Sequence, residues 1–148
     1  MMRRAAILLA VAGAIAAGSV SHAQDGATIF KRCAACHLPT GAGVPGAFPP
    51  LKADVAALAG SPTGRRYLAL VVIRGVSGPI TVGGKPFRGT MPAQSGLNDE
   101  QVAAVLNHVL RGSAAKPFSA KEVAGFRAGS ASLNSAAVAR LRTSAAGK

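Results

Sequence analysis

The chain has 148 residues and a formal net charge of +12, from 17 Lys and Arg against 5 Asp and Glu. This length suits one small domain with some excess, and the basic charge favours either an acidic partner or simple solubility. Because the chain has no Trp and only 1 Tyr, it lacks the aromatic side chains that stack on bases, and we expect no nucleic-acid partner.

Residues 1–23 are predicted to form a removable secretory leader. Met1–Arg4 is basic, an uncharged and mostly apolar run continues to about Ala17, and Ser21-His22-Ala23 places small residues before a cleavage point. The apolar run is shorter than the ~20 residues that span a bilayer, so no permanent membrane span is expected. We therefore expect a periplasmic protein cleaved after Ala23. Cleavage would remove the two arginines of the leader and so lower the formal charge from +12.

The first predicted helix covers residues 25–35. Gly26, Ile29 and Phe30 recur at helical spacing, and Cys33 continues the same face. This helix is expected to present its apolar face to the core and to carry the next motif at its C-terminal end.

That motif is Cys33-Ala34-Ala35-Cys36-His37, two thiols three residues apart with an imidazole directly after them. On a helical turn Cys33 and Cys36 face the same side, so both can form thioethers with the two vinyl groups of one haem. His37 can then bind the iron from one face of the ring. The pattern predicts one haem c, covalently bound.

The two cysteines have other interpretations. A redox disulfide of the thioredoxin type needs a βαβ setting, and no alternating strand leads into this segment. A structural zinc site needs four ligands, and the mature chain offers only His37 and His108 besides Cys33 and Cys36. Haem attachment is the interpretation that the motif favours.

Loops and helices alternate after the motif. Leu38–Pro50 is rich in Pro and Gly and predicts a stiff loop that can line a flat ring. Leu51–Leu58 predicts a short helix. Pro62–Arg74 predicts a longer one, with Ser61 as its cap and Gly75 as its end.

A second glycine-rich loop with a short extended piece is predicted over Val76–Gly89, and Met91 follows in irregular structure before Pro92. Met91 is the only methionine beyond the leader. Its thioether is a candidate iron ligand opposite His37, and such a ligand raises the reduction potential relative to two nitrogens. His108 is the competing donor, but it falls within a helix, where we expect it to pack or to form a hydrogen bond.

The most regular predicted helix starts at an Asn98 cap and closes at Gly112. Its apolar residues recur at helical spacing and are Val102, Val105, Leu106, Val109 and Leu110. We expect this face to pack on Ile29 and Phe30, where each buried side chain contributes about 1.5–3 kcal/mol.

These motifs together resemble the class I cytochromes c. The resemblance covers about residues 26–112. The segments that carry it are Gly26 and Phe30 before Cys33–His37, the Gly41/Gly43 loop, Phe48–Leu51, Pro86–Pro92 and Leu97–Gly112. It implies an all-α fold, a small helical bundle around one covalently attached haem, with His37 as the proximal and Met91 as the distal iron ligand.

The resemblance also implies that a backbone carbonyl at Pro49 or Pro50 accepts a hydrogen bond from the His37 ring. One position departs from the family pattern, because an aromatic residue often stands where this chain has His108.

Residues 113–148 lie beyond the expected haem domain, residues 24–112, and predict a C-terminal extension of two short helices. Phe118–Arg127 and Leu133–Arg142 repeat one pattern of cap and apolar residues. Such short helices are marginal alone, so they either dock on another surface or partly fray. Their apolar faces would be the same whether they dock on a partner or on their own haem domain, and both interpretations stay open.

The function predicted from these patterns is a periplasmic monohaem carrier of single electrons between redox partner proteins, with no catalytic residue of its own. An acidic docking surface is expected on the partners. The chain would act as a diffusible shuttle or as the cytochrome subunit of a dehydrogenase or reductase, and the extension slightly favours the subunit. The alternatives are a haem enzyme or gas sensor with a dissociable distal ligand, and a disulfide-exchange protein using Cys33 and Cys36.

Overall fold

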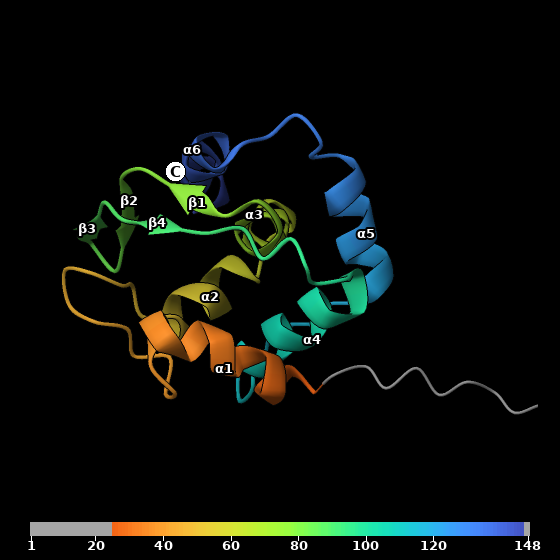
Figure 1. Ribbon diagram of the computed structural model, residues 1–148, viewed down its shortest axis with the longest axis horizontal. Helices are drawn as coiled ribbons and strands as arrows, with labels where there is room; N and C mark the ends of the chain where they lie inside the picture. The colour runs from red at the N-terminus through yellow and green to blue at the C-terminus, as the bar shows by residue number, and fades with distance from the viewer. Residues whose placement is uncertain (1–24, 147–148) are drawn as a thin grey trace, which may run out of the picture.

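The computed structural model describes residues 25–146, so the predicted leader lies outside the described residues. Over that range the fold is mainly helical, as predicted, with four very short strands (Figure 1). The elements are α1 (Gly26–His37), α2 (Lys52–Leu58), α3 (Pro62–Arg74), β1 (Val76–Ser77), β2 (Ile80–Val82), β3 (Lys85–Phe87), β4 (Thr90–Met91), α4 (Asp99–Val109), α5 (Ala120–Ala128) and α6 (Ser135–Ala145).

Polar side chains cap five of these helices, because each supplies an oxygen to a backbone N–H that has no partner within the helix. The caps are Asp25, Ser61, Asn98, Ser119 and Asn134. At Asn98 the capping box is complete, since the Gln101 side chain accepts from the Asn98 backbone N–H. The predicted helix starts are therefore confirmed for the second half of the chain as well as the first.

Helix α1 continues two residues beyond its predicted end and includes His37. Leu38, with φ of 63°, then ends the helix. Because the α-helical backbone runs through His37, the histidine side chain has a fixed direction relative to Cys36, the preceding residue, and to Cys33, about one turn earlier.

Helices α1 and α4 pack against each other, and this confirms the predicted contact between the two ends of the helical domain (Figure 1). Ile29 and Phe30 are buried on the α1 side, and Val102 and Leu106 on the α4 side. The crossing is very close at Gly26, where an added Cβ would lie 2.1 Å from the carbonyl oxygen of Ala104. Only glycine fits there without displacing the backbone.

The segment between α3 and α4 is more ordered than the predicted loop. β2 and β3 form a hairpin, and β1 pairs antiparallel with β4, with Val76 opposite Met91. The expectation that Met91 lies in an irregular loop is therefore wrong, because the chain doubles back and β1 supplies a partner for the Met91 backbone. Strands of two residues have too short a pattern to be recognised in a sequence.

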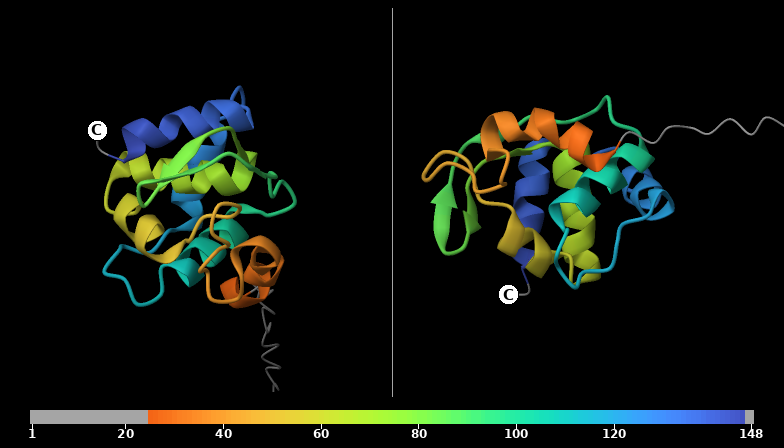
Figure 2. Two further views of the ribbon diagram at one scale, coloured as in Figure 1. Left: turned by 90° about the vertical axis from the view of Figure 1, so that its left-hand side faces the viewer. Right: turned by 90° about the horizontal axis from the view of Figure 1, so that it is seen from below.

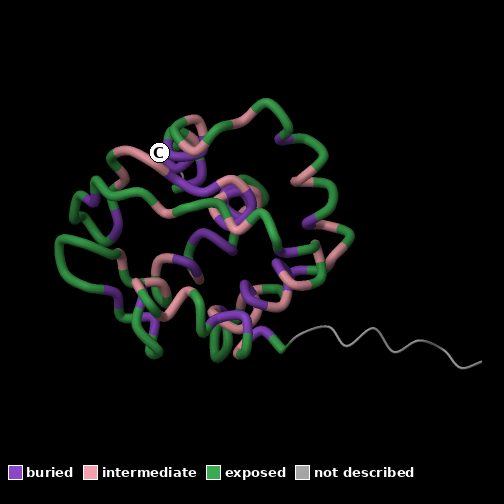
Figure 3. The backbone as a smooth tube through the Cα atoms, viewed as in Figure 1, coloured by how far each residue is buried: buried purple, intermediate pink, exposed green. Residues whose placement is uncertain are grey.

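Helices α5 and α6 pack on the rest of the molecule. Helix α5 contacts α3 and α4, and α6 contacts α3 and β1 (Figures 1 and 2). Phe118, Val123 and Val138 are buried in the same apolar core as the side chains of α1, α3 and α4. In Figure 3, buried positions recur along the C-terminal part of the backbone as well as in the preceding domain. Of the two docking interpretations left open for the extension, the structure shows the one in which it docks on its own chain.

Residues 25–146 contain no helix that is long and apolar enough to span a membrane.

Candidate functional site

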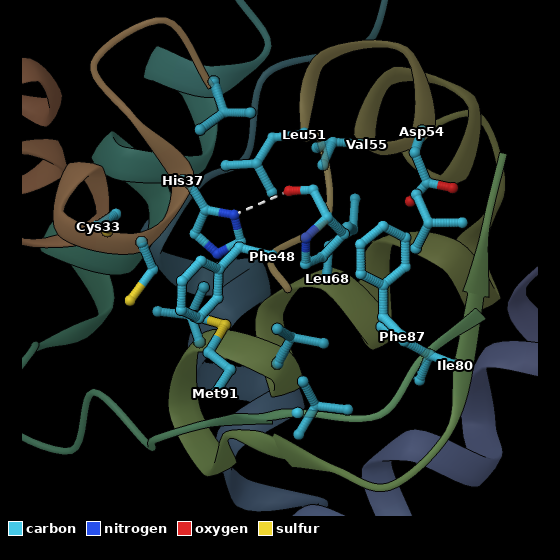
Figure 4. Close-up of a pocket in the computed structure, with 18 of the residues that line it drawn as sticks. Cys33, His37, Phe48, Leu51, Asp54, Val55, Leu68, Ile80, Phe87 and Met91 are labelled. Carbon is cyan, nitrogen blue, oxygen red and sulfur yellow. Dashed lines mark hydrogen bonds between the residues drawn. The ribbon is translucent and has the colours of Figure 1, made fainter. Parts of the chain in front are cut away.

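A cavity lies between the end of α1, the loop after it, α2, α3, the strands and α4 (Figure 4). Most of the side chains that line it are apolar, and Phe48, Leu51, Val55, Leu68, Ile80 and Phe87 are among them. Cys33, Cys36, His37 and Met91 all line this cavity. The fold thus brings together the four predicted site residues, although Met91 is far from the others in the sequence.

Cys33 and Cys36 are half-buried free thiols on the last turns of α1. Burial raises the pKa of the Cys33 thiol, and the charge of the neighbouring Arg32 only partly offsets this effect. A thiol that stays protonated is a poor nucleophile for disulfide exchange. The environment of Cys33 therefore weighs against the disulfide-exchange interpretation.

His37 is almost fully buried, with 7% of its surface exposed. Its Nδ1 lies 3.0 Å from the carbonyl oxygen of Pro49 (dashed line in Figure 4). A carbonyl can only accept, so Nδ1 carries the proton and donates to it, and in the neutral ring Nε2 keeps its lone pair. The contact expected at Pro49 or Pro50 is thus made by Pro49, and it leaves Nε2 available as a ligand atom.

Gly43 shapes the loop that carries Pro49. Its φ is 67°, and an added Cβ would lie 2.3 Å from the carbonyl oxygen of Phe48. The Gly43 N–H donates to the backbone carbonyl of His37 at 3.0 Å, which ties the loop to the end of α1. Glycine is therefore needed here for the close approach that brings Pro49 to the histidine ring.

Met91 enters the same cavity from β4, and Figure 4 shows its thioether and the His37 ring in the same pocket. Two contacts hold the Met91 backbone. One is its pairing with Val76 of β1. The other is the approach of Gly75, where an added Cβ would lie 2.5 Å from the Met91 carbonyl oxygen. Gly75 was predicted only as the end of a helix, but it also leaves room for the segment that carries the methionine.

His108 is not among the residues that line this cavity. Its ring lies 5.0 Å from the Phe30 ring, and Arg111 Nη2 donates to His108 Nδ1 at 2.8 Å. Burial and the charge of Arg111 lower the pKa of His108. The structure places this histidine in the contact between α1 and α4, as the packing and hydrogen-bonding interpretation expects.

The described residues do not supply the group of ligands that a zinc site needs. Within residues 25–146, no three His, Cys, Asp or Glu side chains come together in a way that could hold a metal ion. Structural zinc sites use four such ligands.

The cavity wall also carries a group of polar side chains that the sequence patterns did not predict, formed by Asp54, Tyr67 and Arg142. A signal was present in the sequence. Arg142 lies four residues after Val138, on the face of the last predicted helix that carries its apolar residues. A charged residue on that face needs a buried partner, and Asp54 of α2 is that partner.

The residues around the cavity fit a haem. Two thiols stand one turn apart at its edge, an oriented imidazole nitrogen and a thioether project into it, and its walls are mainly apolar. Imidazole and thioether are the two ligands used by cytochromes c of higher potential. A large flat aromatic ring would cover the apolar side chains that line the cavity.

Comparison with known proteins agrees with this chemistry. Residues 23–113 match the protein family described as Cytochrome c. One Cytochrome c-552 of Thermus thermophilus is 45% identical over 119 residues, which cover 75% of this chain and 80% of that protein. Another Cytochrome c-552 of Thermus thermophilus is 46% identical over 111 residues, which cover 70% of this chain and 85% of that protein.

Proposed function

This chain belongs to the cytochrome c family, and we propose that as a member it carries single electrons between redox partner proteins in the periplasm. The family establishes the coarser statement, that the protein is a haem-based electron carrier with one covalently bound haem c and is not itself an enzyme. The compartment, the ligands and the partners are the proposal.

We assign the covalent bonds to Cys33 and Cys36 and the two axial positions to His37 and Met91. The observation that carries this assignment is the hydrogen bond from His37 Nδ1 to Pro49. It fixes both the tautomer and the orientation of the ring, which is the role that a carbonyl partner has beside a metal-bound histidine. Met91 supports it as the one methionine thioether in the cavity lining.

The haem supplies a one-electron iron couple when it is bound. The contribution of the chain is to keep the surroundings of the iron nearly the same in both oxidation states. Pro49 holds the His37 ring, the pairing of β1 with β4 holds the Met91 backbone, and the apolar walls keep water out. With haem bound, His37 and Met91 would be the two side chains that hold the iron, and electron transfer would then not require a substrate to touch the metal.

Basic charge on the surface supports an acidic partner. Three of the 5 carboxylates of the chain, those of Asp54, Asp99 and Glu122, are in ion pairs. These ion pairs neutralise three carboxylates and three arginines. The net positive charge is therefore carried by the Lys and Arg side chains outside these three pairs. An excess of one sign speeds association with a surface of opposite sign, more strongly at low salt.

Of a diffusible carrier and a cytochrome subunit of a larger enzyme, the packing of the extension favours the diffusible carrier. The preference for a subunit of a dehydrogenase or reductase rested on the extension binding a partner. Helices α5 and α6 instead pack their apolar faces on their own chain, α5 on α3 and α4 and α6 on α3 and β1. Docking of a dehydrogenase subunit would then have to use other surfaces.

The assignment is tested on protein exported from cells that mature cytochromes c. Acid–acetone should leave the red colour on the polypeptide, and the pyridine haemochrome should report one haem for each chain. Colour that washes off the wild-type polypeptide would contradict covalent attachment. Replacing both cysteines, as C33S/C36S, should abolish it.

A second experiment tests the distal ligand. The wild type should show the weak red absorption band of iron–methionine coordination in the oxidised state, and Met91→Ala should lose it. His108→Phe is the matched control and should keep the band, because His108 lies outside the cavity lining. Carbon monoxide or cyanide binding to the wild type as fast as to a five-coordinate haem would favour the enzyme or gas-sensor alternative.

A further inference from the structure

Arg142 is a buried cation on the cavity wall, contributed by the C-terminal helix α6. Only 8% of its surface is exposed. Its Nε donates to the Thr81 carbonyl at 2.6 Å, its Nη2 donates to Asp54 Oδ1 at 2.5 Å, and its guanidinium carbon lies 5.6 Å from the centre of the Tyr67 ring. Contacts from β2, α2 and α3 thus fix one guanidinium beside the cavity.

This cation lies in a mainly apolar wall. The charged side chains that line the cavity in the described part of the chain are Arg32, Asp54 and Arg142. Arg32 is exposed and adjoins Cys33 in α1. Burial lowers the pKa of Arg142, but its hydrogen bonds to Asp54 and Tyr67 raise the pKa by more, so the group stays charged.

The two ends of the cavity differ in chemistry. Figure 4 places Cys33 and Asp54 on opposite sides of the pocket. In haem the vinyl groups and the propionates occupy opposite edges of the ring. If the vinyl edge is bonded to Cys33 and Cys36, the two propionate carboxylates point toward the side of Asp54 and Arg142. Their negative charge needs a cation there, because an unpaired buried charge is costly.

We propose that Arg142 binds a haem propionate and that the Asp54–Arg142 pair adjusts the reduction potential of the iron. This inference rests on the proposed attachment of haem to Cys33 and Cys36. A buried positive charge near the ring favours the reduced iron, which carries one positive charge fewer, and Asp54 partly cancels that charge. The C-terminal extension thus supplies part of the cofactor site, in addition to stabilising the fold.

The two members of the pair have opposite expected effects. Arg142→Gln removes the cation and should lower the midpoint potential. Asp54→Asn leaves Arg142 charged and still bonded to Thr81, and should raise it. A unit charge roughly 10 Å from the iron, at an effective dielectric constant near 20, changes the equilibrium constant of reduction by about tenfold.

The measurement is a spectroelectrochemical titration of the full-length holoprotein. Arg140→Gln is the matched control, because Arg140 is exposed on the same helix and its charge is screened by water. We expect a lower potential for Arg142→Gln, a higher one for Asp54→Asn and nearly the wild-type value for Arg140→Gln. A purely structural role would shift the first two in the same direction, and that result would overturn the proposal.

Two further outcomes are decisive. If Arg142→Gln does not retain haem, the midpoint potential of Asp54→Asn alone tests the inference. An unchanged or lower potential in that variant would overturn it. The haem content of the wild type is measured first by pyridine haemochrome. If the wild type carries no covalent haem, the proposed function itself is wrong. If the wild type has normal haem and the methionine band, but the variants have the wild-type midpoint potential, only the role of Arg142 is wrong.

Discussion

The contact of α1 with α4 and the contact of α5 and α6 with the rest of the chain are built from different interactions. Between α1 and α4 the contact is apolar and very close, with Gly26 against the Ala104 backbone and Phe30 beside His108. The extension combines apolar side chains with arginine–carboxylate pairs. Arg65 with Glu122, Asp99 with Arg127 and Asp54 with Arg142 each join residues 113–146 to the preceding domain.

The contrast shows how a short pair of helices can be added to a domain. Arg65 is 8% exposed, donates to both carboxylate oxygens of Glu122 and to two backbone carbonyls, and lies 3.9 Å from the centre of the Phe118 ring. A planar guanidinium with several donors can hold such a position, whereas an apolar face alone would pack in several registers. We therefore expect the α1–α4 contact to be sensitive to volume and the extension to be sensitive to charge.

Removal of the whole extension should have the largest effect. Truncation after Gly112 removes Phe118, Val123 and Val138 from the core. Each such side chain contributes about 1.5–3 kcal/mol, so the loss approaches the total stability of a typical domain. Thermal unfolding followed by circular dichroism should shift to a much lower temperature. A melting temperature within a few degrees of the full-length holoprotein would contradict this expectation.

A volume change at the α1–α4 contact comes next. Gly26→Ala should destabilise by about 3 kcal/mol, because the new Cβ meets backbone that cannot move aside as a side chain would. Gly125→Ala in α5 is the matched control. Nothing lies within 4 Å of its added Cβ, and alanine favours helix, so it should stabilise slightly. Urea unfolding measures both, and equal effects would contradict the close packing at Gly26.

A charge change in the extension should cost somewhat less. Glu122→Gln removes the carboxylate from the buried Arg65 and should destabilise by about 2 kcal/mol in urea unfolding at neutral pH. Glu100→Gln, in an exposed position on α4, should cost a few tenths of a kcal/mol. If both variants unfold at the same urea concentration, the ion pair does not stabilise the extension.

The same carboxylate should make stability depend on acid. Its hydrogen bond to Arg65 is the main cause that lowers the pKa of Glu122 from its ordinary value of 4.5. The unfolded state therefore binds a proton first, and the stabilisation present above about pH 4.5 is lost as the pH falls toward the pKa of the folded state. Unfolding midpoints measured across this range should fall less steeply for Glu122→Gln than for the wild type.

The smallest effect is expected from His108. Burial and Arg111 lower its pKa from 6.5, so the unfolded state takes up a proton before the folded state does. Stability should decline as the pH falls below about 6.5, and His108→Gln should remove this small decline while leaving the Glu122 effect at lower pH. A decline that persists unchanged in His108→Gln would assign it to another group.

Local features of this protein could be read from the sequence alone. The spacing of Cys33, Cys36 and His37, the caps at Ser61 and Asn98, and the apolar face of α4 each depend on residues within a turn or two of one another. Hydrogen bonds and helical spacing over so short a range are nearly independent of the rest of the fold, and the predicted helices are accordingly confirmed.

The remaining features depend on how distant parts of the chain pack together. Packing selected the Pro49 carbonyl for His37, placed Met91 in a β pair, docked α5 and α6 on their own chain and directed Arg142 to the cavity beside Asp54. Each of these contacts joins segments that are separated along the chain. An apolar face or a charged side chain is compatible with many partners, and only the folded arrangement of the whole chain selects one of them.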